Sequence, residues 1–179
     1  MINLPNTLAA IRILLAPVMF FFLVERDSLL LKDIDISWLN YFAALVFVIA
    51  SVTDFFDGYI ARKWNQKSAL GAIIDPLADK MLVLAAFLGL MMIGIANAWA
   101  VFLILSREFF ITGLRIVAAG EHKDISASNS GKLKTFFQIF AIGFLMMDWP
   151  FGNELLWIAV ILTIYSGMQY VFSNLEKSK

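Results

Sequence analysis

The sequence contains no cysteine, and this absence removes several kinds of chemistry. No disulfide, catalytic thiolate or cysteine-ligated zinc site is possible. Histidine is almost missing as well: the only one, His122, lies in the polar segment EHKDISASNSG, and we give it no catalytic role. Basic and acidic residues balance at fourteen each, so no excess of positive charge is present to attract nucleic acid.

Apolar residues are abundant instead, at 61% of the 179 residues, and the mean hydropathy is +0.81. A soluble domain of this size would be nearer half apolar, so lipid is expected to cover the excess. Charge-free runs predict an all-α polytopic membrane protein with six transmembrane helices. We place these helices at residues 8–24, 38–62, 71–95, 97–119, 131–149 and 154–175. Since no internal repeat or long linker interrupts them, residues 1–179 are expected to form a single membrane domain.

Lysine and arginine are divided unevenly between the two sides of the predicted bundle. Alternating loops place Arg26 and Lys32 on one side and the other twelve of the fourteen basic residues on the opposite side. Because basic residues stay on the cytoplasmic side of a membrane, both termini are predicted to be cytoplasmic. The opening MINLPNTLAAIR lacks the basic region of a signal peptide, so the first helix is expected to be retained. We therefore expect an integral protein of the cytoplasmic (inner) membrane.

Four aspartates lie at the cytoplasmic ends of two predicted helices, in the pattern D-x2-D-G-x2-A-R-x8-G-x3-D-x3-D. Asp54 and Asp57 are three residues apart, and Asp75 and Asp79 are four apart, so each pair shares one helix face. Converging carboxylates repel one another and resist burial unless cations neutralise them. Hard oxygen ligands without nearby His or Cys favour magnesium or manganese, and two such ions commonly serve phosphoryl transfer. The pattern predicts a two-metal site in a polar, cytoplasmic-side active-site cavity.

Four further residues between the aspartates suit a phosphate-bearing substrate. Gly58 and Ala61 keep one helix face low, and Gly71 does the same on the opposite helix, so that a flat or bulky group can approach the backbone. Arg62 adds a planar cation suited to a diphosphate.

These residues carry a family resemblance, because the pattern resembles the signature of the CDP-alcohol phosphotransferases at every defining position. The resemblance implies that Asp54, Asp57, Asp75 and Asp79 hold two Mg2+ or Mn2+ ions and that Asp79 is the catalytic base. It places CDP-diacylglycerol at Asp57 and at the four residues described above: Gly58, Ala61, Arg62 and Gly71. A homodimer is also implied by the resemblance alone.

Segments outside the aspartate pattern resemble the branch of the family that transfers a phosphatidyl group to the sn-1 hydroxyl of glycerol 3-phosphate. These segments are NLPNTLAAIR, SREFFITGLR and GKLKT. One departure is visible at the N-terminus: relatives carry Thr three residues before Arg12, whereas this chain has Ala9. Thr7 or Asn6 would have to substitute for that Thr, so we leave the first helix out of the predicted site.

A cluster of four basic residues is predicted to bind the phosphate of glycerol 3-phosphate. Arg107 and Arg115 are eight residues apart, so they share one face of a helix, and Lys132 and Lys134 open the next helix. Anchoring at the inner leaflet is the alternative role for the arginines. Glu108 is expected either to pair with an arginine or to meet the substrate.

Two other functions stay open at this stage. Within the family the acceptor alcohol can differ, with inositol phosphate or serine as examples, and a cluster of cations favours a phosphorylated acceptor. Carboxylates within a membrane also build metal or proton transporters. A transporter would spread its polar groups through the bilayer midplane and often shows repeated halves, whereas here the acids gather at one side without a repeat.

Overall fold

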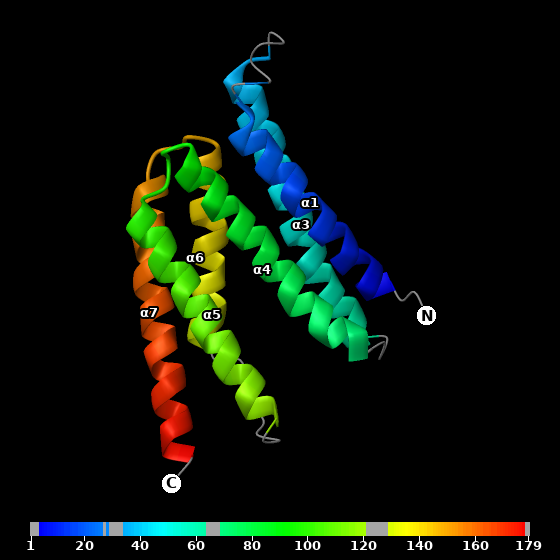
Figure 1. The fold of residues 1–179 in the computed structure, drawn as a ribbon, viewed down its shortest axis with the longest axis vertical. Helices are drawn as coiled ribbons and strands as arrows, with labels where there is room; N and C mark the ends of the chain where they lie inside the picture. Colours follow the sequence, from blue (N-terminus) through cyan, green and yellow to red (C-terminus); the bar gives the residue numbers. More distant parts are fainter. Residues whose placement is uncertain (1–3, 27, 29–33, 64–68, 121–128, 178–179) are drawn as a thin grey trace. The chain divides into compact units, whose positions relative to one another are not determined.

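The structure, a computed structural model, describes residues 4–26, 28, 34–63, 69–120 and 129–177. These residues form six helices and no strand (Figure 1). The helices are α1 (Leu4–Val24), α3 (Ile36–Lys63), α4 (Ala69–Met92), α5 (Ala98–Gly120), α6 (Asn129–Met146) and α7 (Gly152–Lys177). The all-α prediction is confirmed, and each helix begins and ends within four residues of its predicted position. Within the helices, the side chains of residues 4–6, 54–63, 69–76, 79, 117–120, 129 and 173–177 are not described.

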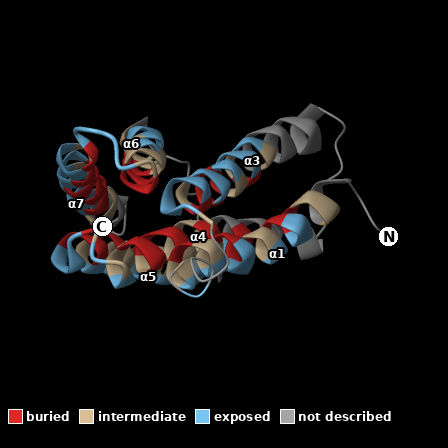
Figure 2. Ribbon diagram, turned by 90° about the horizontal axis from the view of Figure 1, so that it is seen from above, coloured by how far each residue is buried: buried red, intermediate tan, exposed pale blue. Residues whose placement is uncertain are grey.

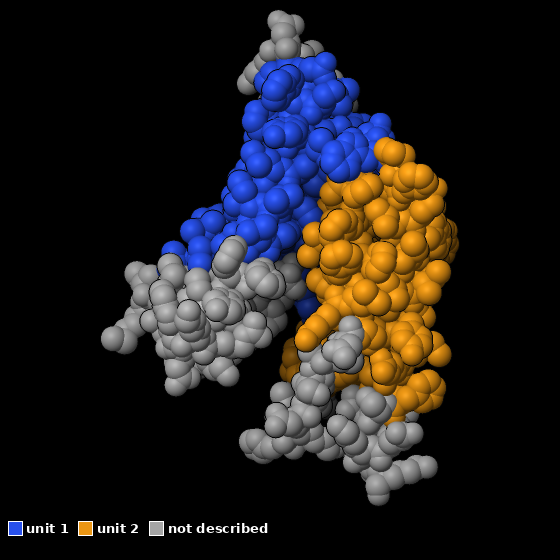
Figure 3. Space-filling view, turned by 180° about the vertical axis from the view of Figure 1, so that it is seen from behind, with its two compact units in different colours: residues 1–95, 145–149 blue, residues 96–144, 150–179 orange. Residues whose placement is uncertain are grey.

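The chain divides into two compact units, which Figure 3 draws in different colours. Unit 1 comprises residues 1–95 and 145–149, and contains α1, α3 and α4. Unit 2 comprises residues 96–144 and 150–179, and contains α5, α7 and most of α6.

Unit 1 is built around α1, which packs against both α3 and α4. The buried positions of α1 recur every three or four residues, as expected for a helix that presents one stripe to its neighbours. They are Ala9, Arg12, Ala16, Met19 and Leu23. Facing helices contribute a similar mixture of small and large side chains: Leu39, Ala43, Ala44, Phe47 and Ala50 from α3, and Ala78, Leu82, Ala86, Phe87 and Leu90 from α4. Small residues at such seams let helix backbones approach closely.

Gly89 of α4 lies directly against α1. A Cβ atom at this position would lie 2.9 Å from Cδ1 and 3.3 Å from Cβ of Leu23, which is itself fully buried. Glycine is therefore favoured here by packing rather than by backbone conformation.

Unit 2 packs α5 against α7, and a buried hydrogen bond ties α6 to α7. The amide Nε2 of Gln138 donates to Oγ1 of Thr163 over 3.1 Å, and both side chains are buried. Apolar residues fill the rest of the interior: Ala100, Val101, Ile104 and Ile111 from α5, Ala141 and Ile142 from α6, and Leu156, Ala159 and Val160 from α7. In Figure 2 these positions are red and the outward positions of the same helices are pale blue.

Specific residues begin and end the helices. Asp35 caps α3, because its Oδ1 accepts a hydrogen bond of 2.7 Å from the backbone N–H of Ser37. Asn97 caps α5 in the same way through the N–H groups of Trp99 and Ala100, at 3.0 and 3.3 Å. After α4, Gly94 adopts a positive φ of 76°, the conformation that closes a helix C-terminus and favours glycine.

Three of the described helices are long and apolar enough to cross a membrane, at Thr7–Val24, Ile36–Thr53 and Gly152–Phe172. The described part of α4 has a shorter apolar stretch, Lys80–Met92. Large apolar side chains also lie exposed along the helices, among them Phe21, Trp38, Phe102, Phe140 and Ile161. Such extensive exposure of apolar groups is typical of a surface covered by lipid rather than by water.

Candidate functional site

The two helices that carry the aspartate pattern are neighbours in unit 1. Asp54 and Asp57 lie in the last three turns of α3, Asp75 and Asp79 lie in the first three turns of α4, and the two helices contact each other. In Figure 1, the end of α3 and the beginnings of α1 and α4 lie together at one end of this unit. Side chains of the four aspartates, and of Gly58, Ala61, Arg62 and Gly71, lie outside the described residues, so the convergence of the carboxylates stays a prediction.

Two contacts relate the positions of the three helices along the axis of unit 1. The ring of Phe22 on α1 lies 6.0 Å, between centroids, from the ring of Phe42 on α3, and Leu23 lies against Gly89 of α4. Along the chain, α1 runs antiparallel to α3 and in the same direction as α4 (Figure 1).

Counting along the helices from these contacts brings Arg12 to the same depth as two of the aspartates. Arg12 lies about 15 Å from the contacts, at a rise of about 1.5 Å per residue. The matching positions are residue 52 on α3 and residue 78 on α4, next to Asp54 and Asp79. A fixed positive charge is therefore present at the level at which a group of negative charges is predicted.

Arg12 is also the largest charged side chain that the described residues bury, with 1% of its surface exposed. It occupies a core position of α1 between Ala9 and Ala16, where an apolar residue would be expected. Arg12 was not among the predicted site residues, because the departure at Ala9 left the first helix out of the prediction. Its charge alone could have identified it, because a charged residue on the inward face of a membrane helix usually has a functional role.

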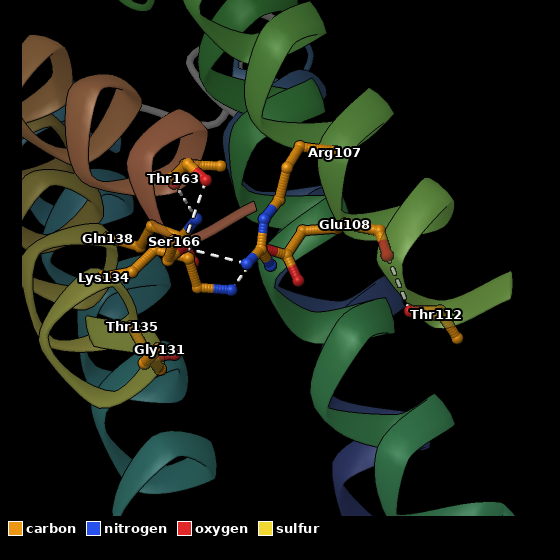
Figure 4. A network of polar contacts seen from close by, with 9 residues as sticks. All are labelled: Arg107, Glu108, Thr112, Gly131, Lys134, Thr135, Gln138, Thr163 and Ser166. Atoms are coloured by element: carbon orange, nitrogen blue, oxygen red, sulfur yellow. Dashed lines mark hydrogen bonds and ion pairs between the residues drawn. The ribbon is translucent and has the colours of Figure 1, made fainter. Parts of the chain in front are cut away.

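The predicted basic cluster belongs to unit 2, where the structure describes all four side chains. Arg107 on α5 is central to a network of polar contacts drawn in Figure 4. Its Nη2 donates a hydrogen bond of 2.9 Å to Oγ of Ser166 on α7, and its Nη1 lies 3.4 Å from Oε1 of Glu108. Only 14% of the Arg107 side chain is exposed, so the guanidinium is held inside the helix bundle.

Glu108 joins two of the predicted phosphate-binding cations. Its Oε1 accepts from Nζ of Lys134 on α6 as well as from Arg107. Side-chain exposures of 17% for Glu108 and 8% for Lys134 show that both partners are largely withdrawn from solvent. The sequence left two roles open for Glu108, and the structure shows pairing with an arginine and also with a lysine.

Helix α7 supplies the other side of this network. Ser166 donates its hydroxyl proton to the backbone carbonyl of Thr163 over 3.1 Å, so its lone pairs face Arg107. The next residue, Gly167, lies against the Arg107 stem: a Cβ atom there would be 3.1 Å from both Cγ and Nε of Arg107. Neither residue was among the predicted site residues.

The remaining two basic residues are more open. Arg115 is exposed, and its Cζ lies 5.5 Å from the centroid of the Tyr170 ring on α7, a cation–π arrangement. Lys132 is exposed near the start of α6, two residues before Lys134. Unit 2 thus brings Arg107 and Lys134 together around Glu108, and sets Arg115 further along the same face of α5. The two cations that meet one carboxylate give this region the excess positive charge that a phosphate monoester requires.

Comparison with known proteins decides the family. A sequence profile of the CDP-alcohol phosphatidyltransferase family matches residues 2–165. This chain belongs to that family. A Bacillus subtilis relative is 40% identical, over 100% of this chain and 98% of its own length. A relative from Rickettsia typhi is 39% identical over 94% of both chains. A relative from Shigella flexneri serotype 5b is 35% identical over 94% of this chain and 93% of its own. All three are named CDP-diacylglycerol–glycerol-3-phosphate 3-phosphatidyltransferase.

Proposed function

We propose that this membrane protein transfers the phosphatidyl group of CDP-diacylglycerol to the sn-1 hydroxyl of glycerol 3-phosphate. The products are phosphatidylglycerophosphate and CMP, so the reaction is a step of phospholipid synthesis. The observation that carries this proposal is the identity of 35–40% to relatives named for this activity, over nearly the whole chain. The complete aspartate pattern and the cation cluster of unit 2 agree with it.

The donor substrate is assigned to the ends of α3 and α4. Oxygen donors from two contacting helices fit hard divalent cations, so Asp54, Asp57, Asp75 and Asp79 would hold two Mg2+ or Mn2+ ions. When bound, such ions neutralise a diphosphate and stabilise charge on a departing nucleotide. Gly58, Ala61, Arg62 and Gly71 would accommodate the cytidine diphosphate beside them, as the family resemblance implies.

In the transfer step, Asp79 accepts the proton of the sn-1 hydroxyl of glycerol 3-phosphate. The freed oxygen forms a bond to the lipid-linked phosphorus, and the bond from that phosphorus to the CMP oxygen breaks. Because a carboxylate is a weak base, correct orientation of the acceptor must supply much of the acceleration. We assign this orientation to Arg107, Arg115, Lys132 and Lys134, which would bind the acceptor's own phosphate.

The setting of the reaction follows from the same proposal. All six helices would span the cytoplasmic membrane, with both termini and a polar active-site cavity on the cytoplasmic side, where the excess of basic residues lies. Acyl chains of the donor would then remain in the inner leaflet throughout the reaction. We also propose a homodimer, supported by family resemblance alone.

A direct assay tests the proposed function. Purified protein in detergent would receive CDP-diacylglycerol, magnesium and one acceptor at a time: glycerol 3-phosphate, glycerol, serine or inositol phosphate. We expect CMP release, with formation of phosphatidylglycerophosphate, only with glycerol 3-phosphate. The Asp54→Asn variant serves as the inactive control. Faster turnover with another acceptor would reassign the substrate, and no CMP release with any acceptor would reject the activity.

A further inference from the structure

We propose that three residues on one face of α7, namely Ser166, Gly167 and Tyr170, position the two arginines of the acceptor site. In the proposed function the arginines bind the phosphate of glycerol 3-phosphate, and this inference rests on that role. Helix α7 thereby determines how well the acceptor is bound, although none of its three residues is assigned a contact with the acceptor.

Ser166 fixes the direction of the Arg107 guanidinium. The hydroxyl carries a single proton, and it donates that proton to the carbonyl of Thr163. Its oxygen can therefore act only as an acceptor toward Nη2 of Arg107, at 2.9 Å. Ser166 is itself 1% exposed, so water cannot readily replace this hydrogen bond. An arginine held in this way loses less conformational freedom when a phosphate binds.

The part of α7 that holds Ser166 is fixed in turn by α6. Gln138 donates to Thr163 Oγ1 at 3.1 Å, and both side chains are buried. Lys134 lies four residues before Gln138, one turn away on the same helix, and binds Glu108. The same two helices thus position Arg107 and Lys134 relative to each other, as Figure 4 shows.

Gly167 provides the space for the Arg107 stem. A Cβ at this position would lie 3.1 Å from Cγ and from Nε of Arg107, closer than ordinary van der Waals contact. Any larger residue would push the side chain away from Ser166. The buried Nε of Arg107 has no hydrogen-bond partner in the described structure, so the guanidinium is directed by contact with α7 and by its bonds to Ser166 and Glu108.

Tyr170 extends the same face by one turn and reaches Arg115. Positions 163, 166, 167 and 170 lie on one side of a helix. The ring of Tyr170 lies under the guanidinium of Arg115, with 5.5 Å between Cζ and the ring centroid. A single face of α7 therefore contacts both arginines of α5.

The test compares acceptor and donor kinetics in four single variants. Ser166→Ala and Gly167→Ala should each raise the KM for glycerol 3-phosphate about tenfold, the effect of misplacing one charge-assisted hydrogen bond. Neither variant should change the KM for CDP-diacylglycerol. Tyr170→Leu should raise the acceptor KM more than Tyr170→Phe does, because phenylalanine keeps the ring beneath Arg115. The matched control is Gly143→Ala on α6, where a Cβ would meet nothing within 4 Å and where no change is expected.

A double-variant comparison separates positioning from general damage. In an Arg107→Ala background, Ser166→Ala should add little to the acceptor KM, because the residue it positions has gone. Equal effects of Ser166→Ala with and without Arg107 would overturn the proposal. So would unchanged acceptor KM values in both Ser166→Ala and Gly167→Ala, and if Gly167→Ala fails to fold, Ser166→Ala alone decides.

Failure of this inference can be distinguished from failure of the proposed function. If wild-type protein uses glycerol 3-phosphate and Arg107→Ala raises its KM while the α7 variants do not, only the positioning role is wrong. If Arg107→Ala leaves the acceptor KM unchanged, the acceptor assignment itself is wrong, and this inference falls with it.

Discussion

The Glu108–Lys134 ion pair allows a quantitative prediction about the stability of unit 2. Both side chains are more than four-fifths withdrawn from solvent, and Glu108 also lies 3.4 Å from Arg107. Glu108→Gln keeps the shape of the side chain but removes the one anion shared by two cations. We expect it to lower the free energy of unfolding by about 3 kcal/mol, the low end for breaking a buried pair.

Lys134→Met should have a smaller effect, because Glu108 would still have Arg107 as a partner. A loss of about 2 kcal/mol is expected, within the range of one charge-assisted hydrogen bond. The double variant Glu108→Gln/Lys134→Met removes both charges of the pair, so neither is left without its partner. We therefore expect a loss of unfolding free energy of about 3 kcal/mol rather than the sum of the two single losses. The coupling free energy is then about 2 kcal/mol.

Reversible unfolding in mixed micelles, with increasing SDS, measures these four free energies. The control is Lys132→Met, which removes an exposed lysine two residues away and should change stability by less than about 0.5 kcal/mol. Additivity of the two single variants within about 0.5 kcal/mol would refute the reasoning, since it would mean that the two side chains do not depend on each other.

Three further predictions concern unit 1. Replacing one aspartate by asparagine should nearly abolish CMP release in each of Asp54→Asn, Asp57→Asn and Asp75→Asn, while the protein still elutes as a folded species. Full activity of any one variant at saturating magnesium would count against the two-metal site. Gly89→Ala should lower the free energy of unfolding by about 1–3 kcal/mol through overcrowding at Leu23, whereas Gly143→Ala should not. Hydrogen bonds from Ser37, chiefly from its backbone N–H, lower the pKa of Asp35 in the folded protein. The ionised Asp35 carboxylate therefore contributes its full stability above the unfolded pKa of about 3.9, and this contribution is lost as the pH falls through the lower folded pKa. Between pH 2 and 6 the denaturation midpoint should therefore fall further in the wild type than in Asp35→Asn.

The sequence predicted the helices well because their signal is local. The charge-free runs that predict the helices lie within the helices themselves. The prediction of residues 97–119 for α5, for example, differs from the observed Ala98–Gly120 by one residue at each end. Family membership could also be predicted, because four aspartates at fixed spacing occupy only two neighbouring helices.

The partners of the polar residues could not be predicted in the same way. Glu108 and Lys134 are 26 residues apart, and Arg107 and Ser166 are 59 apart. Whether they meet depends on how far each helix is rotated about its axis, and a rotation of one residue position turns a side chain by about 100°. A serine and a glycine in an apolar helix carry no sequence signal that distinguishes a packing role from the positioning of an arginine.

The burial of Arg12 has a consequence for how the chain is made. In the proposed topology, α1 enters the bilayer during synthesis before α3 and α4 exist to cover it. A lone arginine near the centre of a membrane helix disfavours insertion by about 2.5–3.5 kcal/mol, and less where it can reach the headgroups. Arg12 is eight residues from the start of α1, within reach of that interface while the helix is alone.

We therefore expect α1 to insert with Arg12 extended toward the headgroups, and to withdraw this side chain only when α3 and α4 arrive. The packing of α1 against α3 and α4 would then await synthesis of residues as far as Met92. With Arg12 kept, truncated nascent chains that end before α4 should leave a cysteine introduced for Ala9, which is buried on the same face of α1, open to a water-soluble thiol reagent, and chains that extend beyond α4 should protect it.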